Sequence, residues 1–374
     1  MSFLESIYIY LPSIMVFLLA CFLTLLLYRF YCVYSKKREN RSSFLKKGML
    51  LFSSLLPVSL LAALRGIGVG ADTRNLWNGY LECLTRPFVQ QITMDFSEFL
   101  YDLFRWLVCR ITNGNVQVFF FLMAFLTLLF VSFAINKWNT NYKPLALFIF
   151  LMLFGPNLMN QSRQLLSVAI MFFAFSCLYK SEYKRFILWS VAAVLIHLSA
   201  IVSAILYLTV FLLCKNNRSN FLFLFVLIIT SLLSRYLVSL LGNLVVFEKY
   251  AKYFDSSESF NIGFGLLLVL TPTVIPTVLS RKEINDSRIR DTIYLTAPTR
   301  LIGYYSYFLY RITYFFSGIA MFAFPTALDR ARGIRFVVLK VAFVFLPFLY
   351  FLLLYCWKDV QIYMPYYTFW QNGF

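Results

Sequence analysis

The chain has 374 residues, of which 61% are hydrophobic, 20% aromatic and only 13% charged, and its mean hydropathy is +0.74. These values exclude a soluble fold, because a soluble chain of this length needs many more polar residues to cover its surface. Apolar runs such as 14–27 lack the two-residue alternation of a transmembrane β-barrel, which leaves helices as the spanning element. We therefore expect an all-α, polytopic integral membrane protein.

Ten apolar segments follow one another, and we expect the whole chain, 1–374, to form a single transmembrane domain. The segments cover about residues 7–34, 48–64, 116–135, 144–158, 162–180, 186–213, 219–241, 261–280, 301–325 and 336–356. A helix needs about 20 apolar residues to cross a bilayer. Because the first segment has neither a basic n-region nor a small-residue cleavage site, we expect a retained span rather than a signal peptide.

The net charge of +18 comes from basic residues that gather in short loops. The clusters are Lys36/Lys37/Arg38/Arg41/Lys46/Lys47, Lys137/Lys143, Lys180/Lys184/Arg185, Lys215/Arg218, Arg281/Lys282/Arg288/Arg290/Arg300 and Arg330/Arg332/Arg335/Lys340. This distribution is typical of the positive-inside rule, which places these loops in the cytoplasm and the N-terminus outside. Since the basic residues follow no recognition motif, we expect no nucleic-acid partner.

Two apolar segments, 186–213 and 301–325, have basic residues at both ends, so the charge rule places both ends of each in the cytoplasm. We interpret each as a hairpin of two short or broken helices that turns near His197 or Arg311. The ten segments then give about 10–12 transmembrane passes. Interrupted helices commonly mark substrate sites in membrane proteins.

The longest loop, 65–115, is predicted to be external and periplasmic. Its five arginines are balanced by five carboxylates. Asp95 and Glu98 have the spacing of a capping box, and the apolar residues that follow repeat with helical period, which predicts an interfacial amphipathic helix at about 95–111. Cys83 and Cys109 also lie in this loop, where either a disulfide or two separate thiols is possible.

Four sites in the sequence are candidates for chemistry. The stretch from Arg65 to Thr73 contains three closely spaced glycines and Asp72, but it lacks the Gly-Lys-Ser/Thr ending of a P-loop. Arg163 opens an apolar helix, and Arg311 lies well inside an apolar segment, where arginine is costly. His197 is the only histidine of the chain. The alternatives are an ordinary helix exit, snorkelling arginines and a packed histidine.

The predicted topology places Arg65, Arg163, His197 and Arg311 together at the outer surface of the membrane. Three guanidinium groups and one titratable base at an interface favour a polyanionic, membrane-embedded substrate such as a lipid diphosphate. No Cys or His spacing is typical of a metal site, so we expect neither a metal nor another cofactor.

The order of these motifs resembles the EpsG/Wzy family of bacterial polysaccharide polymerases. The resemblance spans roughly residues 60–320. It rests on the glycine stretch that runs from Arg65 through Asp72, on Arg163-Gln164 opening a helix, on Ala192-Ala193-Val194-Leu195-Ile196-His197-Leu198-Ser199-Ala200 and on Arg311-Ile312-Thr313-Tyr314-Phe315.

The resemblance implies a metal-independent glycosyltransferase of GT-C-like architecture in the bacterial inner (cytoplasmic) membrane. Such an enzyme joins undecaprenyl-diphosphate-linked oligosaccharide repeat units into O-antigen or capsular polysaccharide at the periplasmic face. Its partners would be the lipid-linked donor and acceptor, the bilayer and a chain-length regulator protein. We expect Arg163 and Arg311 to bind the diphosphate with support from Arg65, His197 to act as the base, and Asp72 to be the reserve base.

The main alternative is a transporter or flippase of lipid-linked oligosaccharide, which also needs arginines and a large cavity. A flippase should carry charged residues along a path between the leaflets and show two related halves. The candidate residues instead gather on one side, which favours chemistry. A purely structural membrane subunit is the third hypothesis, and it leaves Arg311 unexplained.

Overall fold

A computed structural model describes residues 3–37, 43–92, 98–138, 140–214, 267–302, 310–358, 363 and 365–372. The described residues are almost entirely helical, and β-structure among them is limited to one isolated bridge, between Arg65 and Thr368. The predicted all-α fold is therefore confirmed. The predicted span 219–241 lies outside the described residues, as do Asp95 of the predicted capping box and Phe96 of the predicted apolar helix face.

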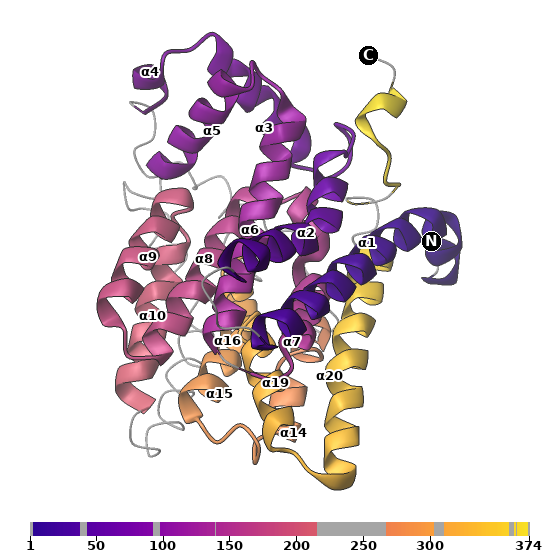
Figure 1. Cartoon of the computed structure of the whole chain (residues 1–374), viewed down its shortest axis with the longest axis vertical. Coiled ribbons are helices and arrows are strands. Elements are labelled where there is room, and N and C mark those ends of the chain that lie inside the picture. Colours follow the sequence, from indigo (N-terminus) through magenta and orange to yellow (C-terminus); the bar gives the residue numbers. More distant parts are fainter. Residues whose placement is uncertain are drawn as a thin grey trace. The chain divides into compact units, whose positions relative to one another are not determined.

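The chain divides into two compact units, Met1–Leu198 with Phe351–Phe374, and Ser199–Tyr350. In the first unit, α1 packs against α2, α2 against α6, α6 against α8, and α8 against α9 (Figure 1). Its helices are α1 (Phe3–Lys37), α2 (Ser43–Ala63), α3 (Thr73–Leu81), η1 (Glu82–Leu84), α4 (Phe88–Ile92), α5 (Phe99–Ile111), α6 (Val116–Trp138), α7 (Lys143–Phe154), η3 (Gly155–Met159), α8 (Ser162–Tyr179), α9 (Tyr183–Ile196), η6 (Leu354–Lys358) and η7 (Phe369–Asn372).

The described part of the second unit contains several short helices and one long one. They are α10 (Ala200–Leu213), α14 (Val274–Leu279), α15 (Ser287–Tyr294), α16 (Thr296–Ile302), α18 (Thr313–Ser317), α19 (Ala320–Arg330) and α20 (Gly333–Leu353), of which α20 ends in residues of the first unit. The rings of Phe324 and Phe343 stack with centroids 4.4 Å apart, which joins α19 to α20. The unit thus has an aromatic core of its own.

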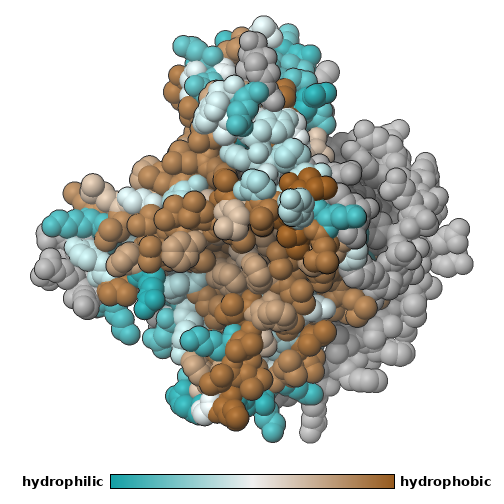
Figure 2. All heavy atoms as spheres, turned by 90° about the vertical axis from the view of Figure 1, so that its right-hand side faces the viewer, coloured by the Kyte–Doolittle hydropathy of each residue, from teal (hydrophilic) through white to brown (hydrophobic). Residues whose placement is uncertain are grey.

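Among the described residues, five helices are long and apolar enough to cross a membrane, which supports the polytopic assignment. They cover Phe3–Lys36, Phe44–Ala63, Val116–Trp138, Ser162–Tyr179 and Gly333–Lys358. Apolar side chains cover much of the face shown in Figure 2. On α1, Phe22 and Phe30 are each 60% exposed, and Ile334 and Val341 on α20 are 85% and 60% exposed. Exposing such apolar surface to water is unfavourable in free energy, whereas contact with lipid is not.

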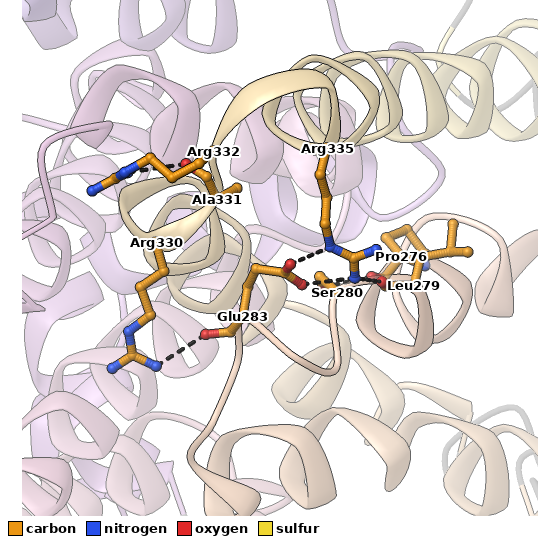
Figure 3. Close-up of polar contacts among 8 residues, drawn as sticks. All are labelled: Pro276, Leu279, Ser280, Glu283, Arg330, Ala331, Arg332 and Arg335. Carbon is orange, nitrogen blue, oxygen red and sulfur yellow. Dashed lines mark hydrogen bonds and ion pairs between the residues drawn. The ribbon is translucent and has the colours of Figure 1, made fainter.

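Polar contacts fix the turn between α19 and α20 to the residues after α14 (Figure 3). The Arg335 guanidinium pairs with the Glu283 carboxylate through Nε and Nη2, and Nη2 also donates to the Leu279 carbonyl at 2.8 Å. Arg330 donates to the Glu283 carbonyl at 2.9 Å. The hydrogen bonds from Arg335 lower the pKa of Glu283. Arg330 and Arg335, two of the arginines in the predicted basic loops, therefore form polar contacts within the second unit.

The predicted segment 186–213 is interrupted where the sequence placed the turn. Helix α9 ends at Ile196, His197 is extended with φ −155° and ψ 118°, and α10 begins at Ala200. Each helix has 14 residues, too few to cross a full hydrocarbon core. The break is confirmed, and the reversal of direction that a hairpin requires stays a prediction because α9 and α10 belong to different units.

The segment 301–325 is also broken, with a turn at Arg311 and Ile312 before α18. The Arg300 guanidinium lies 3.6 Å from the centroid of the Tyr310 ring, next to this turn. The reversal of direction that a hairpin requires stays a prediction, because residues 303–309 lie outside the described residues.

Cysteine labelling tests the predicted hairpin of 186–213. If both ends of the segment face the cytoplasm, a cysteine replacing Arg185 and one replacing Asn217 should react with a membrane-impermeant reagent only when the cytoplasmic face is open. The parent protein with its seven native cysteines sets the background. Labelling of the two positions from opposite faces would show that α9 and α10 together cross the membrane once.

Candidate functional site

The glycine-rich stretch forms a tight loop between α2 and α3 in the first unit. Gly70 has φ +88°, and a Cβ there would lie 2.3 Å from the Met159 carbonyl oxygen, so only glycine fits. The Asp72 backbone N–H donates to Asn160 Oδ1 at 2.9 Å. The Thr73 hydroxyl lies 3.0 Å from the same Met159 oxygen. The loop is therefore fixed to the residues that immediately precede α8.

Arg65 is fully buried beneath this loop. Its Nε donates to Thr73 Oγ1 at 3.1 Å and its Nη1 to the Ala62 carbonyl at 2.6 Å, and its guanidinium carbon lies 3.7 Å from the centroid of the Phe120 ring. Burial lowers the pKa of Arg65 to about 9. With 0% of the residue exposed, Arg65 contributes by holding the loop in place, and direct contact with a diphosphate is not supported by this geometry.

The C-terminal segment packs on the same loop, a contact that no pattern in the sequence predicts. The Gly66 N–H donates to the Tyr367 carbonyl at 2.8 Å, and the Phe369 N–H donates to the Leu64 carbonyl at 3.0 Å. A Cβ on Gly68 would lie 2.0 Å from the Tyr367 hydroxyl oxygen, so this glycine allows close approach. Residues more than 300 positions apart in the chain thus build one end of the first unit.

Arg163 lies in the first turn of α8, as the sequence predicted. Its Nη1 forms a hydrogen bond and ion pair with Oε2 of Glu98, and its side chain is 38% exposed. The guanidinium carbon lies 5.0 Å from the centroid of the Tyr101 ring, within range of a cation–π contact. Arg163 is therefore held by α5 and still reaches the surface of the unit.

His197 lies just past the C-terminal end of α9, where the backbone becomes extended. The ring is 6% exposed, and Nδ1 lies 2.8 Å from Oε1 of Glu98. The backbone N–H of His197 still donates to the Ala193 carbonyl at 2.9 Å. The imidazole is thus positioned by both the end of α9 and a carboxylate from α5.

Glu98 is the functional residue that sequence reasoning missed. The sequence predicted a capping box in which Glu98 serves the backbone of a helix starting near residue 95. In the structure Glu98 is itself the N-cap residue of α5, and its side chain forms no cap hydrogen bond. The carboxylate contacts Arg163 and His197. The capping box itself is not tested, because Asp95 lies outside the described residues. One feature of the sequence could have indicated such a residue, because Arg163 and His197 lie in apolar segments, where a charged or titratable group usually has a partner of opposite charge.

The loop that the sequence predicts to be external contains helix α5, which begins at Phe99 rather than near 95. Tyr101, Val108 and Cys109 of α5 are buried. Leu107 and Ile111 stay exposed, at 42% and 78%. Apolar exposure of this kind suits a helix that lies on a lipid surface, and the interfacial position stays a prediction.

Cys83 and Cys109 are both buried and are not joined by a disulfide. The Cys109 thiol donates to the Tyr80 carbonyl at 3.2 Å, and the Cys83 thiol to the Gly79 carbonyl at 3.4 Å. Burial raises the pKa of the Cys109 thiol. The sequence left open either a disulfide or two separate thiols, and the structure has two separate thiols.

Arg311 lies in the second unit, at the turn that precedes α18. Its carbonyl accepts a hydrogen bond from the Tyr314 N–H at 3.3 Å, and the rings of Tyr310 and Tyr314 have centroids 5.7 Å apart. Arg300, which is only 6% exposed, stacks on Tyr310. Two arginines and two tyrosines therefore gather here, and Arg300 is a neighbour of Arg311 that the charge rule assigned to a cytoplasmic loop.

The site in the first unit therefore consists of Arg163, Glu98 and His197, with the glycine loop and Asp72 fixed to the start of α8. A carboxylate beside an imidazole is the arrangement that orients a general base, and a partly exposed guanidinium can bind an anion. Within the part of the chain that the structure describes, no three His, Cys, Asp or Glu side chains gather as a metal site requires.

Comparison with known proteins gives one family. The sequence model of the EpsG family matches residues 48–368, which covers most of the chain and includes every candidate residue described above. No curated protein and no solved structure was found to match the chain.

A glycine substitution tests whether the loop is held as described. Gly70→Ala places a side chain at positive φ and against the Met159 carbonyl, and should lower the free energy of unfolding by about 1–3 kcal/mol. Gly48→Ala is the matched control, because a Cβ on Gly48 meets nothing within 4 Å and alanine favours the helix. Thermal unfolding of the purified proteins compares them, and equal stability of the two variants would contradict the loop geometry.

Proposed function

The chain belongs to the EpsG family, which includes polysaccharide polymerases, and on that premise we propose that it is a membrane glycosyltransferase. Its reaction is the polymerisation of undecaprenyl-diphosphate-linked oligosaccharide repeat units into O-antigen or capsular polysaccharide. The site faces the periplasm from the bacterial inner membrane. The observation that carries the proposal is the cluster of Arg163, Glu98 and His197, which combines an anion-binding group with an oriented base in a family that includes such enzymes.

The proposed reaction needs only a base and cations. A hydroxyl oxygen of the acceptor sugar attacks C1 of the donor sugar, and its proton passes to His197 Nε2. The bond between C1 and the phosphate oxygen breaks, and its electron pair leaves with the diphosphate. A diphosphate is a competent leaving group, so the site requires stabilisation of the developing charge rather than a general acid.

The arginines have separate roles in this proposal. Arg163 is partly exposed and contributes a guanidinium that can form paired, charge-assisted hydrogen bonds to phosphate oxygens. Arg311 of the second unit, with Arg300 beside it, is the other arginine that we propose to bind the diphosphate. Arg65 supports the site from beneath the glycine loop. Asp72 remains the reserve base, because its backbone is fixed close to Asn160, three residues before Arg163.

A transporter or flippase of lipid-linked oligosaccharide is the alternative function. It also requires arginines that bind a diphosphate, but it has no use for a base. The 2.8 Å contact between His197 Nδ1 and the Glu98 carboxylate favours the enzyme, because this contact orients an imidazole for proton transfer.

Purified protein and lipid-linked repeat units test the two functions directly. A polymerase should convert the repeat units into a ladder of longer saccharides in detergent or proteoliposomes without added nucleotide. Movement of the lipid across the vesicle membrane with no ladder would contradict the polymerase and support the flippase.

Arginine substitutions test the proposed diphosphate site. Arg163→Ala and Arg311→Ala should each slow ladder formation about 100- to 1000-fold, because each removes a charge that stabilises the leaving diphosphate. Arg→Lys should also be poorly tolerated, since lysine lacks the planar fork. Arg86→Ala is the matched control, because Arg86 is an exposed arginine that pairs with Glu82 and has no part in the proposed site. Near-normal ladders from both variants would overturn the diphosphate site.

Replacement of the single histidine tests the base. His197→Ala should slow ladder formation about 100- to 10,000-fold, and the remaining activity should lose its pH dependence near neutrality. The amount of folded protein in the membrane is measured alongside the rate. Near-normal ladders from this variant would transfer the role of base to Asp72 or another carboxylate.

A further inference from the structure

The Glu98 carboxylate lies between two groups that come from different helices. Oε2 accepts a hydrogen bond from Arg163 at the start of α8, and Oε1 lies 2.8 Å from Nδ1 of His197 at the end of α9. The Glu98 side chain is only 7% exposed. Burial of a carboxylate is costly unless it is paired and hydrogen-bonded, so a residue in this position requires both partners.

The contact with Nδ1 determines where the imidazole carries its proton. An ionised carboxylate has only acceptor atoms, so a ring nitrogen 2.8 Å away must be the donor. In the neutral ring one nitrogen carries the hydrogen and the other the lone pair. Contact with Glu98 therefore places the hydrogen on Nδ1 and the lone pair on Nε2.

Arg163 makes this arrangement compatible with a base. A carboxylate alone beside an imidazole favours the charged imidazolium, which has no lone pair to accept a proton. The Arg163 guanidinium on the other carboxylate oxygen neutralises Glu98, so the pair of side chains carries no net charge before His197 is counted. The ring can then stay neutral in its buried position.

We propose that Glu98 is a positioning residue, which holds His197 in the Nδ1–H tautomer so that Nε2 accepts the proton of the attacking hydroxyl. The importance of this tautomer for catalysis rests on the proposed function. The tautomer itself follows from the geometry of Glu98 and His197 alone.

The single histidine makes the tautomer directly measurable. Protein labelled with ¹⁵N-histidine gives the two nitrogen signals of one imidazole, and their shifts report which nitrogen carries the hydrogen. At a pH where the ring is neutral, the wild-type protein in lipid nanodiscs should show a protonated Nδ1 and an unprotonated Nε2. A hydrogen on Nε2 would overturn the proposal, and this measurement requires no variant to fold.

Glu98→Gln provides the second arm of the test. The amide keeps the shape of the side chain but loses the charge, so the hydrogen should no longer be confined to Nδ1, and ladder formation should slow about 100-fold or more. Glu82→Gln is the matched control, because Glu82 is a half-exposed carboxylate of the same loop that pairs with Arg86. This control should leave both the tautomer and the ladders unchanged.

The two readouts separate the positioning role from the proposed function. If Glu98→Gln abolishes ladders while the hydrogen stays on Nδ1, Glu98 acts in another way and the positioning role is overturned. If the wild-type tautomer is Nδ1–H but purified protein forms no ladders at all, the proposed polymerase fails while the assigned geometry stands. If the tautomer changes and the rate does not, His197 is not the base.

Discussion

The arrangement of the site depends on one buried interaction, the Glu98 carboxylate that joins Arg163 and His197. It ties the N-terminal ends of α5 and α8 to the C-terminal end of α9. Loss of Arg163 would leave the nearly buried Glu98 carboxylate without this ion pair, and loss of His197 would remove a hydrogen-bond partner, so the three side chains stabilise one another. A helix of the loop between two spans is thereby fixed to helices of the membrane-embedded bundle.

The same end of the first unit is stabilised by a second set of contacts that involve mainly backbone. Gly70 approaches the Met159 carbonyl closely, and the C-terminal segment pairs with the backbone at Leu64 and Gly66. Arg65 fills the space beneath the loop. These contacts bring Asp72 to within one hydrogen bond of Asn160, so the glycine loop and Arg163 lie together although about 90 residues separate them in the sequence.

Hydropathy and loop charge predicted the class of protein, the five long apolar helices of the described residues and the break at His197, because apolar length and helix interruption are local properties. The partner of His197 was beyond this reasoning, since Glu98 is 99 residues away and its spacing from Asp95 suggested a helix cap. The same limit applies to the stacking of Arg300 on Tyr310, a contact that no local pattern of charge or hydropathy indicates. The buried state of Arg65 likewise depends on Phe120 and on the C-terminal segment, which no local pattern connects to it.

A double-mutant cycle between Glu98 and His197 tests most directly whether the two residues act as a unit. The rates of ladder formation are compared for the wild type, Glu98→Gln, His197→Ala and the double variant. If Glu98 acts through His197, the double variant should be no slower than His197→Ala alone, because the positioning residue has nothing left to position. Losses that multiply in the double variant would show that the two residues act independently and would contradict the account.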